Sequence, residues 1–420
     1  MINSKREHTM KKILLLILLW AAMPAVHALL YAQLRTVHVT NAGTFYQHIS
    51  ESERYGITQL NVSGDLNGDD IKIIREMAGC DFMTKDKYSL RTLDLSDANI
   101  VQGGGSYLDL AGTSFYTAPD QIGIAMFGYS QLRSITLPKN TQKIDMLAFF
   151  QNENLIHVGL SNGLIVIGSS AFSECSQLES LDIPSTVRYI NHSAFKRCVN
   201  LKSIILPDGL TTLSEDVFMD CRSLSKMKIP NLISNIGSGL FSGCINIQSI
   251  ELPDNIGWID IYAFKNCHRL EQIEIPESVT MVSNGVFENC ASLKDLYIKA
   301  IVPPTCYELP FLGVPKSCIL HIPKGTTDAY SKAEGWKDFI LKEEAYAPDA
   351  TTSIEHSVRV WGAEGGLFIN TEAPVQVKVF AMSGALMKDT NISTGLHRIN
   401  LPKGAYVVLL GDSSYKVVIE

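Results

Sequence analysis

Residues 194–216 read AFKRCVNLKSIILPDGLTTLSED, and residues 217–239, VFMDCRSLSKMKIPNLISNIGSG, are a degenerate copy of them. Frames of 23 residues follow one another without a gap from Ala148 to the frame that begins at Val286, and an incomplete frame begins at Ala125. A fixed period of this length is the sequence signature of a solenoid, in which each repeat is one structural unit. Two columns of the repeat are phenylalanine (Phe149, Phe172, Phe195, Phe218, Phe241, Phe264, Phe287) and cysteine (Cys175, Cys198, Cys221, Cys244, Cys267, Cys290).

The spacing inside one frame predicts a strand, a second apolar contact and a turn. Leu181 and Ile183 alternate with polar residues, as on a strand with one buried face. Pro184 has no N–H group and ends the pairing. Ile190 begins the second apolar contact, and the Ala-Phe pair of the next frame opens a short helical or 3-10 turn. Because one such unit cannot bury its apolar face alone, we expect a solenoid of parallel strands.

The cysteine column is expected to hold buried free thiols. Stacked coils would place its members about 4.8 Å apart and facing the same way. A disulfide needs facing Cβ atoms about 3.5–4.5 Å apart, and a zinc site needs ligands that close a tetrahedron. The thiols should therefore pack as small hydrophobes beside stacked rings. Cys306 and Cys318 lie outside the column and are candidates for a disulfide in an exported protein.

The columns Phe-x-x-Cys-x-x-Leu-x-x-Ile-x-Leu-Pro resemble the BspA-like leucine-rich repeat of bacterial surface proteins. The resemblance covers residues 125–298, and LRTLDLSDANI (residues 90–100) is similar to a further repeat. It implies a leucine-rich-repeat solenoid over residues 89–300, interrupted by an insertion at 101–124. Residues 33–88 read strand, helix, strand, helix and are similar to the αβ N-terminal cap of that family. Residues 301–346 resemble its C-terminal cap.

The remaining C-terminal sequence changes character. Residues 347–353 are predicted to be a linker. In residues 354–420 short strands, at 368–370, 375–380, 397–401, 405–410 and 415–419, predict a small antiparallel β-sandwich. VFAMSGALMK, LPKGAYVV and YKVVIE resemble the C-terminal domains that sort Bacteroidetes proteins through type IX secretion. Glu420 departs from the basic ending common in that family, so a cleaved domain and a retained one both stay open.

Residues 1–32 predict an address for export. Lys11 and Lys12 precede the apolar run ILLLILLW, and small residues offer cleavage points after Ala28 or Ala32. This order is typical of a secretory signal peptide, and no other segment is apolar and long enough to span a membrane. The expected location is therefore secreted or on the outer cell surface. A net charge of −7 argues against a nucleic-acid partner, because phosphates need a basic surface.

No catalytic motif of the HExxH, GxSxG, Walker or CxxC type appears, so no enzyme and no cofactor are expected. The segment GDLNGDDIKIIRE places Asp65, Asn67, Asp69 and Glu76 at the spacing of an EF-hand calcium loop. Position six of that loop, which should be glycine, is Asp70. The favoured interpretation is a turn followed by a helix capped by Asp69 or Asp70, with no metal.

The outward positions of the strands are the candidate binding surface. They form two mainly polar columns with few aromatic residues, which points to a broad protein-binding face rather than a sugar-stacking one. Partners expected from the resemblance are host extracellular matrix proteins or other cells; the alternatives are a glycan-binding accessory protein and a structural spacer. The candidate residues are His157, Asp182, Lys226, Lys228, Glu251, Glu274, Asp295 and Tyr297 on the strands, and Tyr107 and Tyr116 in the insertion.

Overall fold

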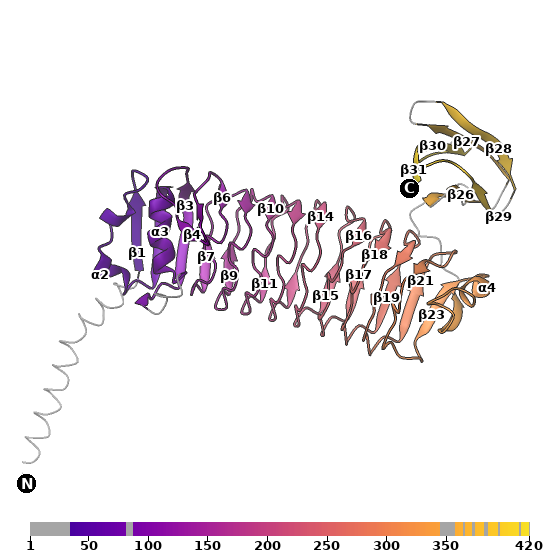
Figure 1. The fold of residues 1–420 in the computed structure, drawn as a ribbon, viewed down its shortest axis with the longest axis horizontal. Helices are drawn as coiled ribbons and strands as arrows, with labels where there is room; N and C mark the ends of the chain where they lie inside the picture. Colours follow the sequence, from indigo (N-terminus) through magenta and orange to yellow (C-terminus); the bar gives the residue numbers. More distant parts are fainter. Residues whose placement is uncertain are drawn as a thin grey trace, which may run out of the picture. The chain divides into compact units, whose positions relative to one another are not determined.

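Each 23-residue frame forms one turn of a coil, and the coils stack along one axis (Figure 1). The computed structural model describes residues 34–80, 87–344, 358–363, 366–371, 374–381, 385–393, 395–410 and 413–419. The chain divides into two units, residues 1–344 and 345–420. The first unit is a parallel β-solenoid of about 13 turns. The predicted signal peptide, 1–32, and linker, 347–353, lie outside the described residues.

The first sheet side of the solenoid contains the strands predicted from the leucine column. Its strands pair in parallel and in register within four successive sheets, β1-β2-β3-β7-β9, β11-β13, β15-β17 and β19-β21-β23-β24. In the second of these, Ser180 lies beside Ser203 and Leu181 beside Ile204. The alternation is that of a sheet with one buried face, since Leu181 is 4% exposed. The strands are β1 (Leu34–Val39), β2 (Gln59–Leu66), β3 (Thr92–Ile100), β7 (Ser134–Thr136), β9 (His157–Gly159), β11 (Ser180–Leu181), β13 (Ser203–Ile204), β15 (Lys226–Lys228), β17 (Ser249–Glu251), β19 (Gln272–Ile275), β21 (Asp295–Ile298), β23 (Ile319–Pro323) and β24 (Ile340–Glu344).

The second sheet side is made of two-residue strands at the predicted second apolar contact. Ile190 points inward and is fully buried, and Tyr189 beside it is exposed. The pairing is interrupted between β14 and β16, where the strands fall into two separate sheets. The strands are β6 (Gln121–Ile122), β8 (Lys143–Ile144), β10 (Val166–Ile167), β12 (Tyr189–Ile190), β14 (Thr212–Leu213), β16 (Asn235–Ile236), β18 (Trp258–Ile259), β20 (Met281–Val282) and β22 (Thr305–Cys306).

A third side, here called the turn side, contains the Ala-Phe pairs. Its residues form single i→i+3 turns, such as Ser173 N–H to Ser170 O at 3.2 Å. Left-handed residues interrupt these turns, for example Ser170 at φ 52° and Glu174 at φ 64°, so no helix continues. Between coils the N–H groups point one way: those of Ser170, Phe172 and Glu174 donate to carbonyls of the next coil at 2.8–2.9 Å. The carbonyls of each coil consequently face the preceding coil.

The phenylalanine column forms a continuous stack inside the turn side. The ring centroids of Phe172 and Phe195 are 5.5 Å apart and their planes differ by 3°. The stack extends one ring beyond the predicted column at each end, to Phe127 and Phe311. All seven predicted rings are fully buried. The stack therefore runs through the length of the repeat region as one core.

The column thiols are free and fully buried, and each donates to a carbonyl of a preceding coil. The Sγ of Cys221 lies 3.2 Å from the carbonyl oxygen of Phe195. Burial raises the pKa of Cys198 to about 12. The candidate disulfide between Cys306 and Cys318 is wrong, because both residues are free. Cys306 ends β22 on the second sheet side and Cys318 precedes β23 on the first, so the fold directs them to different sides.

The N-terminal cap differs in two details from the predicted strand-helix order. The first predicted helix is only the 3-10 turn η1 (Phe45–Gln47), followed by the four-residue α2 (Glu51–Arg54). Helix α3 (Gly68–Met77) is capped by Asn67, whose side chain accepts the N–H of Asp69, and not by Asp69 or Asp70. Asp70 is the reciprocal partner, since it accepts the Asn67 N–H at 3.0 Å.

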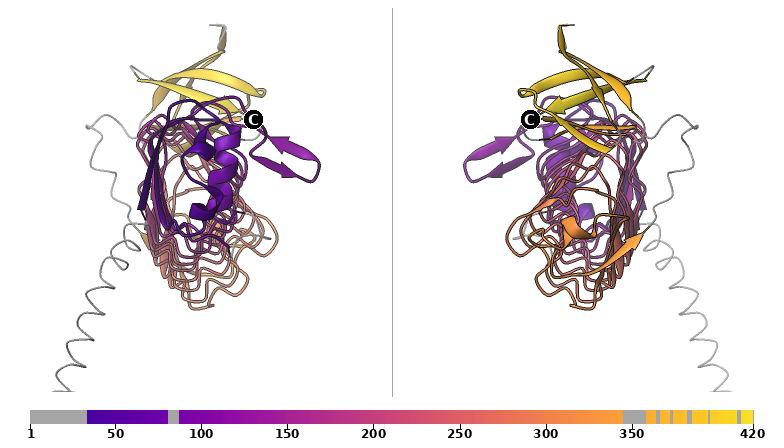
Figure 2. Two further views of the ribbon diagram at one scale, coloured as in Figure 1. Left: turned by 90° about the vertical axis from the view of Figure 1, so that its left-hand side faces the viewer. Right: turned by 90° about the vertical axis from the view of Figure 1, so that its right-hand side faces the viewer.

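The insertion contains a small hairpin, β4 (Leu108–Leu110) and β5 (Thr113–Phe115), which projects from the side of the first coils (Figure 2). At the opposite end the solenoid is closed by α4 (Thr327–Tyr330), the segment after it, and β24. Trp336 is fully buried there, and its Nε1 donates to Pro304 O at 2.7 Å. Its ring lies 5.0 Å from that of Phe311, so it terminates the ring stack.

The second unit has two antiparallel sheets, β25-β26-β29 and β28-β27-β30-β31, which share one apolar core. Of its strands, β25 and β28 were not predicted. The sequence of β28, LMKDTNI, has no apolar alternation, and six of its seven residues are exposed or half-buried. The strands are β25 (Val358–Ala363), β26 (Gly366–Thr371), β27 (Val375–Ala381), β28 (Leu386–Ile392), β29 (Gly395–Ile399), β30 (Gly404–Leu410) and β31 (Ser413–Ile419).

Candidate functional site

The middle of the first sheet side exposes charged side chains of both signs. Lys226 and Lys228 project from β15, and Glu251 lies beside Lys228 on β17. Asp182 follows the end of β11, and His157 begins β9. All five are exposed. Some lysines elsewhere on the solenoid pair with a carboxylate one coil away, as in Lys202–Glu179 and Lys294–Glu271 at 2.8 Å. Lys226 and Lys228 form no ion pair within the described part of the chain.

An exposed isoleucine lies among these charges. Ile205 is 83% exposed, the largest value of any large apolar residue that the structure describes. It follows the end of β13, in the column that runs from Asp182 to Lys228. The sequence places Ile205 in this outward column. Because the column is mainly polar, its charged members were predicted as binding residues and Ile205 was not. An apolar side chain at a polar column position is the signal that identifies it.

The C-terminal end of the first sheet side is engaged in its own contacts. The Glu274 carboxylate pairs with Lys299 at 2.7 Å. The buried His321 ring lies 2.7 Å from the carboxylate of Asp295 and 2.8 Å from that of Glu344. Tyr297 stacks on His321 at 4.2 Å. Asp295 and Tyr297 therefore hold the terminal coils together, which leaves less of their surface for a partner.

Hydrogen bonds also lower the pKa of a carboxyl on β24, the last strand of this side. Those from Lys342 and then His321 lower the pKa of the Glu344 carboxyl below its ordinary value of 4.5. The charged form of this carboxyl is thus favoured at the edge of the sheet.

The prediction that Tyr107 is an exposed binding residue is wrong. Its side chain is 3% exposed, and its hydroxyl donates to Ile124 O at 2.8 Å. The Arg75 guanidinium lies 5.7 Å from its ring centre. Burial raises the pKa of Tyr107 far above its ordinary value. Tyr116 is 60% exposed, next to the hairpin.

The candidate calcium residues serve local structure. Asp65 accepts a hydrogen bond from Asn99, and Asp69 accepts one from Gly105 N–H at 3.0 Å. Asn67 caps α3, and Glu76 lies further along that helix. Within the described ranges, no group of three or more His, Cys, Asp or Glu side chains is placed to hold a metal ion.

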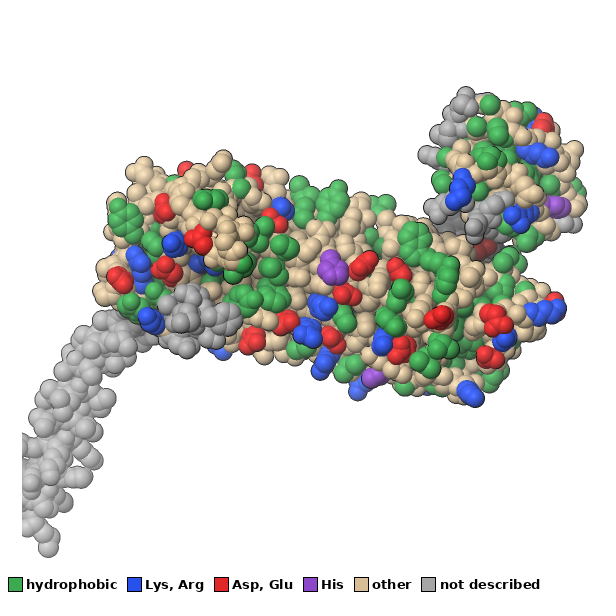
Figure 3. Space-filling model, viewed as in Figure 1, with side chains coloured by type: hydrophobic (Ala, Val, Ile, Leu, Met, Phe, Trp, Pro, Cys, Tyr) green, Lys and Arg blue, Asp and Glu red, His purple; other side chains and the backbone are tan. Residues whose placement is uncertain are grey.

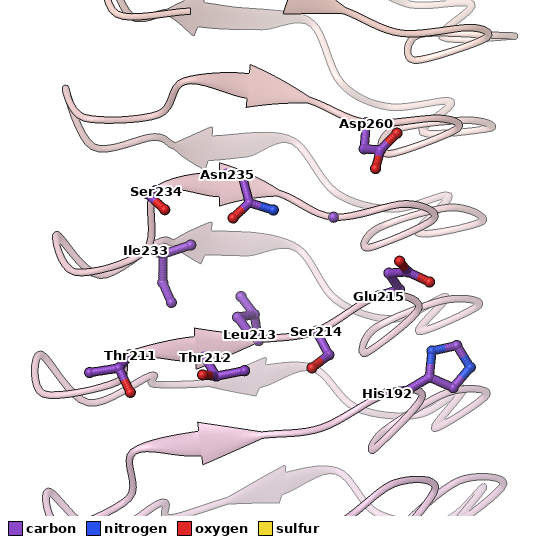
Figure 4. Close-up of a pocket in the computed structure, with 11 residues that line it drawn as sticks. His192, Thr211, Thr212, Leu213, Ser214, Glu215, Ile233, Ser234, Asn235 and Asp260 are labelled. Atoms are coloured by element: carbon purple, nitrogen blue, oxygen red, sulfur yellow. The ribbon is translucent and has the colours of Figure 1, made fainter. Parts of the chain in front are cut away.

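A depression of about 490 Å³ lies on the second sheet side, at the interruption between β14 and β16 (Figure 4). The binding residues predicted from the sequence lie on the first sheet side and in the insertion, so this depression was not predicted. The inward prediction for Ile190 contains the necessary signal, because the residue before it must then point outward. Figure 4 shows that four successive coils contribute: His192 from one, Thr212 and Glu215 from the next, Asn235 from the third and Asp260 from the fourth.

Charges on the first unit are mixed rather than gathered. In the view of Figure 3, Lys and Arg side chains are interspersed with Asp, Glu and apolar groups along the coils. Among the described residues no helix is long and apolar enough to cross a membrane, and α3 has 10 residues.

Part of the chain matches a family model. Residues 110–225 and 189–304 match the model of the BspA type leucine rich repeat region. A search of curated proteins found no match. Similar solved structures include the leucine rich repeat protein of T. pallidum, at 26% identity over 39% of this chain and 74% of that chain, with a TM-score of 0.35. A leucine-rich repeat protein from Bacteroides ovatus is 18% identical over 69% of this chain and 84% of its own, with a TM-score of 0.35. A leucine rich cell surface protein from Faecalibacterium prausnitzii is 16% identical over 59% of this chain and 88% of its own, with a TM-score of 0.28. The first unit is thus a leucine-rich-repeat solenoid whose residues 110–304 match the BspA type.

Proposed function

We propose that this chain is an exported, cell-surface binding protein that holds a protein partner against the first sheet side. The BspA-type match supports a surface role, and one similar structure carries the name of a cell surface protein. The observation that carries the proposal is Ile205, an apolar side chain 83% exposed on an otherwise polar face. Host extracellular matrix proteins are the proposed class of partner.

The surroundings of Ile205 suit an interface. Interfaces commonly contain a small apolar anchor within a polar rim that excludes water. Asp182, Lys226, Lys228 and Glu251 supply such a rim with both signs of charge. Charge at a rim affects the rate and specificity of association more than its affinity. The partner should therefore present an apolar pocket flanked by separate acidic and basic groups.

A binding assay with the full mature chain tests this proposal. Immobilised fibronectin, laminin, collagen and fibrinogen would be probed by surface plasmon resonance. We expect saturable binding to one of them, with Ile205→Asp reducing affinity at least tenfold, about 1.4 kcal/mol. Lys226→Glu combined with Lys228→Glu should mainly slow association. Leu232→Asp is the matched control, because Leu232 is also an exposed apolar residue, at 56%, and lies between β15 and β16.

Absence of saturable binding across this panel would count against the matrix proposal and favour a structural spacer. Unchanged affinity in Ile205→Asp would contradict the proposed interface and mean that the partner binds elsewhere on the chain.

Export is a separate part of the proposal. Mass spectrometry of the protein from fractionated cells should find a mature start at Leu29 or Gln33 and exposure at the surface. An intact start in the cytoplasm would remove the premise of a surface partner. The same spectra would show whether the C-terminal unit is cleaved or retained.

The alternative of glycan binding through Tyr107 and Tyr116 loses one of its two residues, because Tyr107 is buried. A glycan role is better supported by a different surface.

A further inference from the structure

The depression on the second sheet side is an interruption in an otherwise regular ladder. Elsewhere on this side each two-residue strand pairs with the next, as Tyr189 does with Thr212 and Asn235 with Trp258. Between β14 and β16 no such pairing forms, and the 490 Å³ depression lies there. The fold therefore opens a recess between two paired strips of sheet.

An exposed aromatic side chain lies on each flank of the recess. Tyr189 is 44% exposed and lies one strand before Thr212, whereas Trp258 is 38% exposed and lies one strand after Asn235. The strands that carry these two residues are three coils apart, which is roughly 14 Å at about 4.8 Å per coil. The same two coils contribute His192 and Asp260 to the lining of the recess. The aromatic residues thus lie on the two strands that border the recess, in coils that also line it.

Between the flanks the recess is polar and its side chains have hydrogen-bonding capacity to spare. Within the part of the chain that the structure describes, the side chains of Thr212, Ser214 and Asn235 make no hydrogen bond. Asp260 uses one carboxylate oxygen to accept the Ile261 N–H at 2.7 Å, which leaves the other available. Hydroxyl, amide and carboxylate groups can each bind a ligand hydroxyl.

The charge and shape of the recess further restrict the class of ligand that can bind there. The two carboxylates in its lining are those of Glu215 and Asp260, and no Lys or Arg lines it, so an anionic ligand would be repelled. Gly237 lies in the lining where neighbouring coils have Ser214 and Asp260. A Cβ at Gly237 would meet nothing closer than 3.5 Å, and its backbone is not left-handed. The missing side chain keeps the recess open without any demand of the backbone for glycine.

We propose that this surface binds a neutral hexose oligosaccharide, with one sugar ring on each aromatic flank and the rings between them over the recess. A pyranose ring has an apolar C–H face, which packs on the face of an aromatic ring, and hydroxyl edges, which hydrogen-bond to polar side chains. Binding sites of this kind combine aromatic contact with a few placed polar groups. The proposal goes beyond protein binding at the first sheet side and does not depend on it.

Calorimetric titration of the full mature chain with maltohexaose, cellohexaose and mannohexaose tests the proposal. We expect one of the three to bind. Trp258→Ala and Gly237→Gln should each weaken that binding at least tenfold, the first by removing a stacking surface and the second by filling the recess. Trp258→Phe should retain most of the affinity, because it keeps an aromatic face. Tyr46→Ala is the matched control, since Tyr46 is 56% exposed in the N-terminal cap.

Tryptophan fluorescence supplies a readout that a general effect on folding would not reproduce. Sugar binding should shift the emission of the unaltered protein, and the shift should disappear in Trp258→Phe although calorimetry still detects binding. Failure of all three hexasaccharides to bind would overturn the proposal. So would binding that survives Trp258→Ala and Gly237→Gln, or that is lost in Tyr116→Ala instead. Loss of matrix-protein binding in Ile205→Asp with sugar binding intact would show that the two surfaces act separately.

Discussion

The turn side and the sheet sides of the solenoid are built in opposite ways. On the turn side successive coils of the repeat carry phenylalanine at the same position, so that Phe218 stacks between Phe195 and Phe241 at 5.8 and 5.7 Å. On the sheet sides only the inward residues repeat, whereas outward neighbours differ, as Lys226 and Ser249 do. The turn side therefore supplies much of the stability, and the sheet sides are free to vary and bind.

The hydrogen bonds of the two kinds of side differ as well. A parallel sheet uses donors and acceptors on both edges of every strand. Around the Ala-Phe pairs of the turn side the inter-coil N–H groups point toward the C-terminal end, as when Phe172 N–H donates to Ala194 O at 2.8 Å. Aligned peptide dipoles add together, as they do in a helix. A one-directional ladder consequently begins with a row of carbonyls that no preceding coil can satisfy.

The N-terminal cap and the insertion together close this row of carbonyls. Ile124 O accepts the Tyr107 hydroxyl, and Met126 O accepts from Arg75. In the later coils the equivalent carbonyls accept backbone N–H groups, Met146 O from Ala125 and Ala148 O from Phe127. A phenol and a guanidinium thus take the place of a missing coil, which explains why Tyr107 is buried.

The largest expected effect is a loss of folding stability in alkaline solution, which comes from the buried thiols of the turn side. Burial raises the pKa of the column thiols from 9.0, to about 12 for Cys198 and Cys290. Between those pH values the unfolded chain loses protons that the folded protein keeps. Their contribution is complete below pH 9 and falls as pH rises, by about 1.4 kcal/mol per thiol per pH unit. For the six column thiols together, the free energy of unfolding at pH 10 should be roughly 8 kcal/mol lower than at neutral pH.

Guanidinium unfolding at pH 7 to 10, with a reductant present, measures this drop. The double variant Cys221→Ala, Cys244→Ala should be less stable at pH 7 but should lose less stability between pH 9 and 10, by the share of two thiols, about 2 kcal/mol. Equal slopes in the two proteins would contradict the assignment of the pH dependence to the column.

The next effect concerns the ring stack. Phe218→Ala should lower the free energy of unfolding by about 3–5 kcal/mol, because it removes a buried ring and leaves a cavity in the middle of the stack. Tyr189→Ala, on the second sheet side and 44% exposed, should stay within about 0.5 kcal/mol. Equilibrium denaturation of both variants makes the comparison.

Because each coil contacts only its neighbours, the Phe218→Ala transition should also broaden or separate into two steps. Comparable losses in the two variants would mean that the turn side is not the main source of stability.

The residues of the repeat core could be predicted from the sequence because they recur at one fixed interval. Phe127 and Phe311 were not predicted to belong to the stack, since Phe127 precedes Phe149 by 22 residues and Phe311 follows Phe287 by 24. A strict period of 23 passes over both. Allowing one residue of slippage at the ends of the repeat would have found them.

The functional surfaces depend on contacts that no local pattern encodes. Tyr107 looked exposed because it follows a Gly-rich stretch, yet the insertion folds back and brings it to Arg75, 32 residues earlier in the chain. The recess between β14 and β16 depends on a break in pairing that the repeat itself does not predict. The outward positions of Tyr189 and Trp258 were readable from the sequence once the second apolar contact was assigned.

The smallest expected effect, at the carbonyl end of the ladder, tests how the two kinds of side begin. Arg75 is 8% exposed and donates to Ala125 O and Met126 O. Arg75→Met should cost about 1–3 kcal/mol, because it leaves buried carbonyls without a donor. Hydrogen exchange of the first coils should accelerate while that of the coils around Phe218 stays unchanged. Arg269→Met, an exposed control, should have neither effect. Uniform acceleration along the whole solenoid would instead mean that the cap supports every coil and that the ladder is not closed locally, since a nearest-neighbour stack can transmit a lost end contact only by opening from that end.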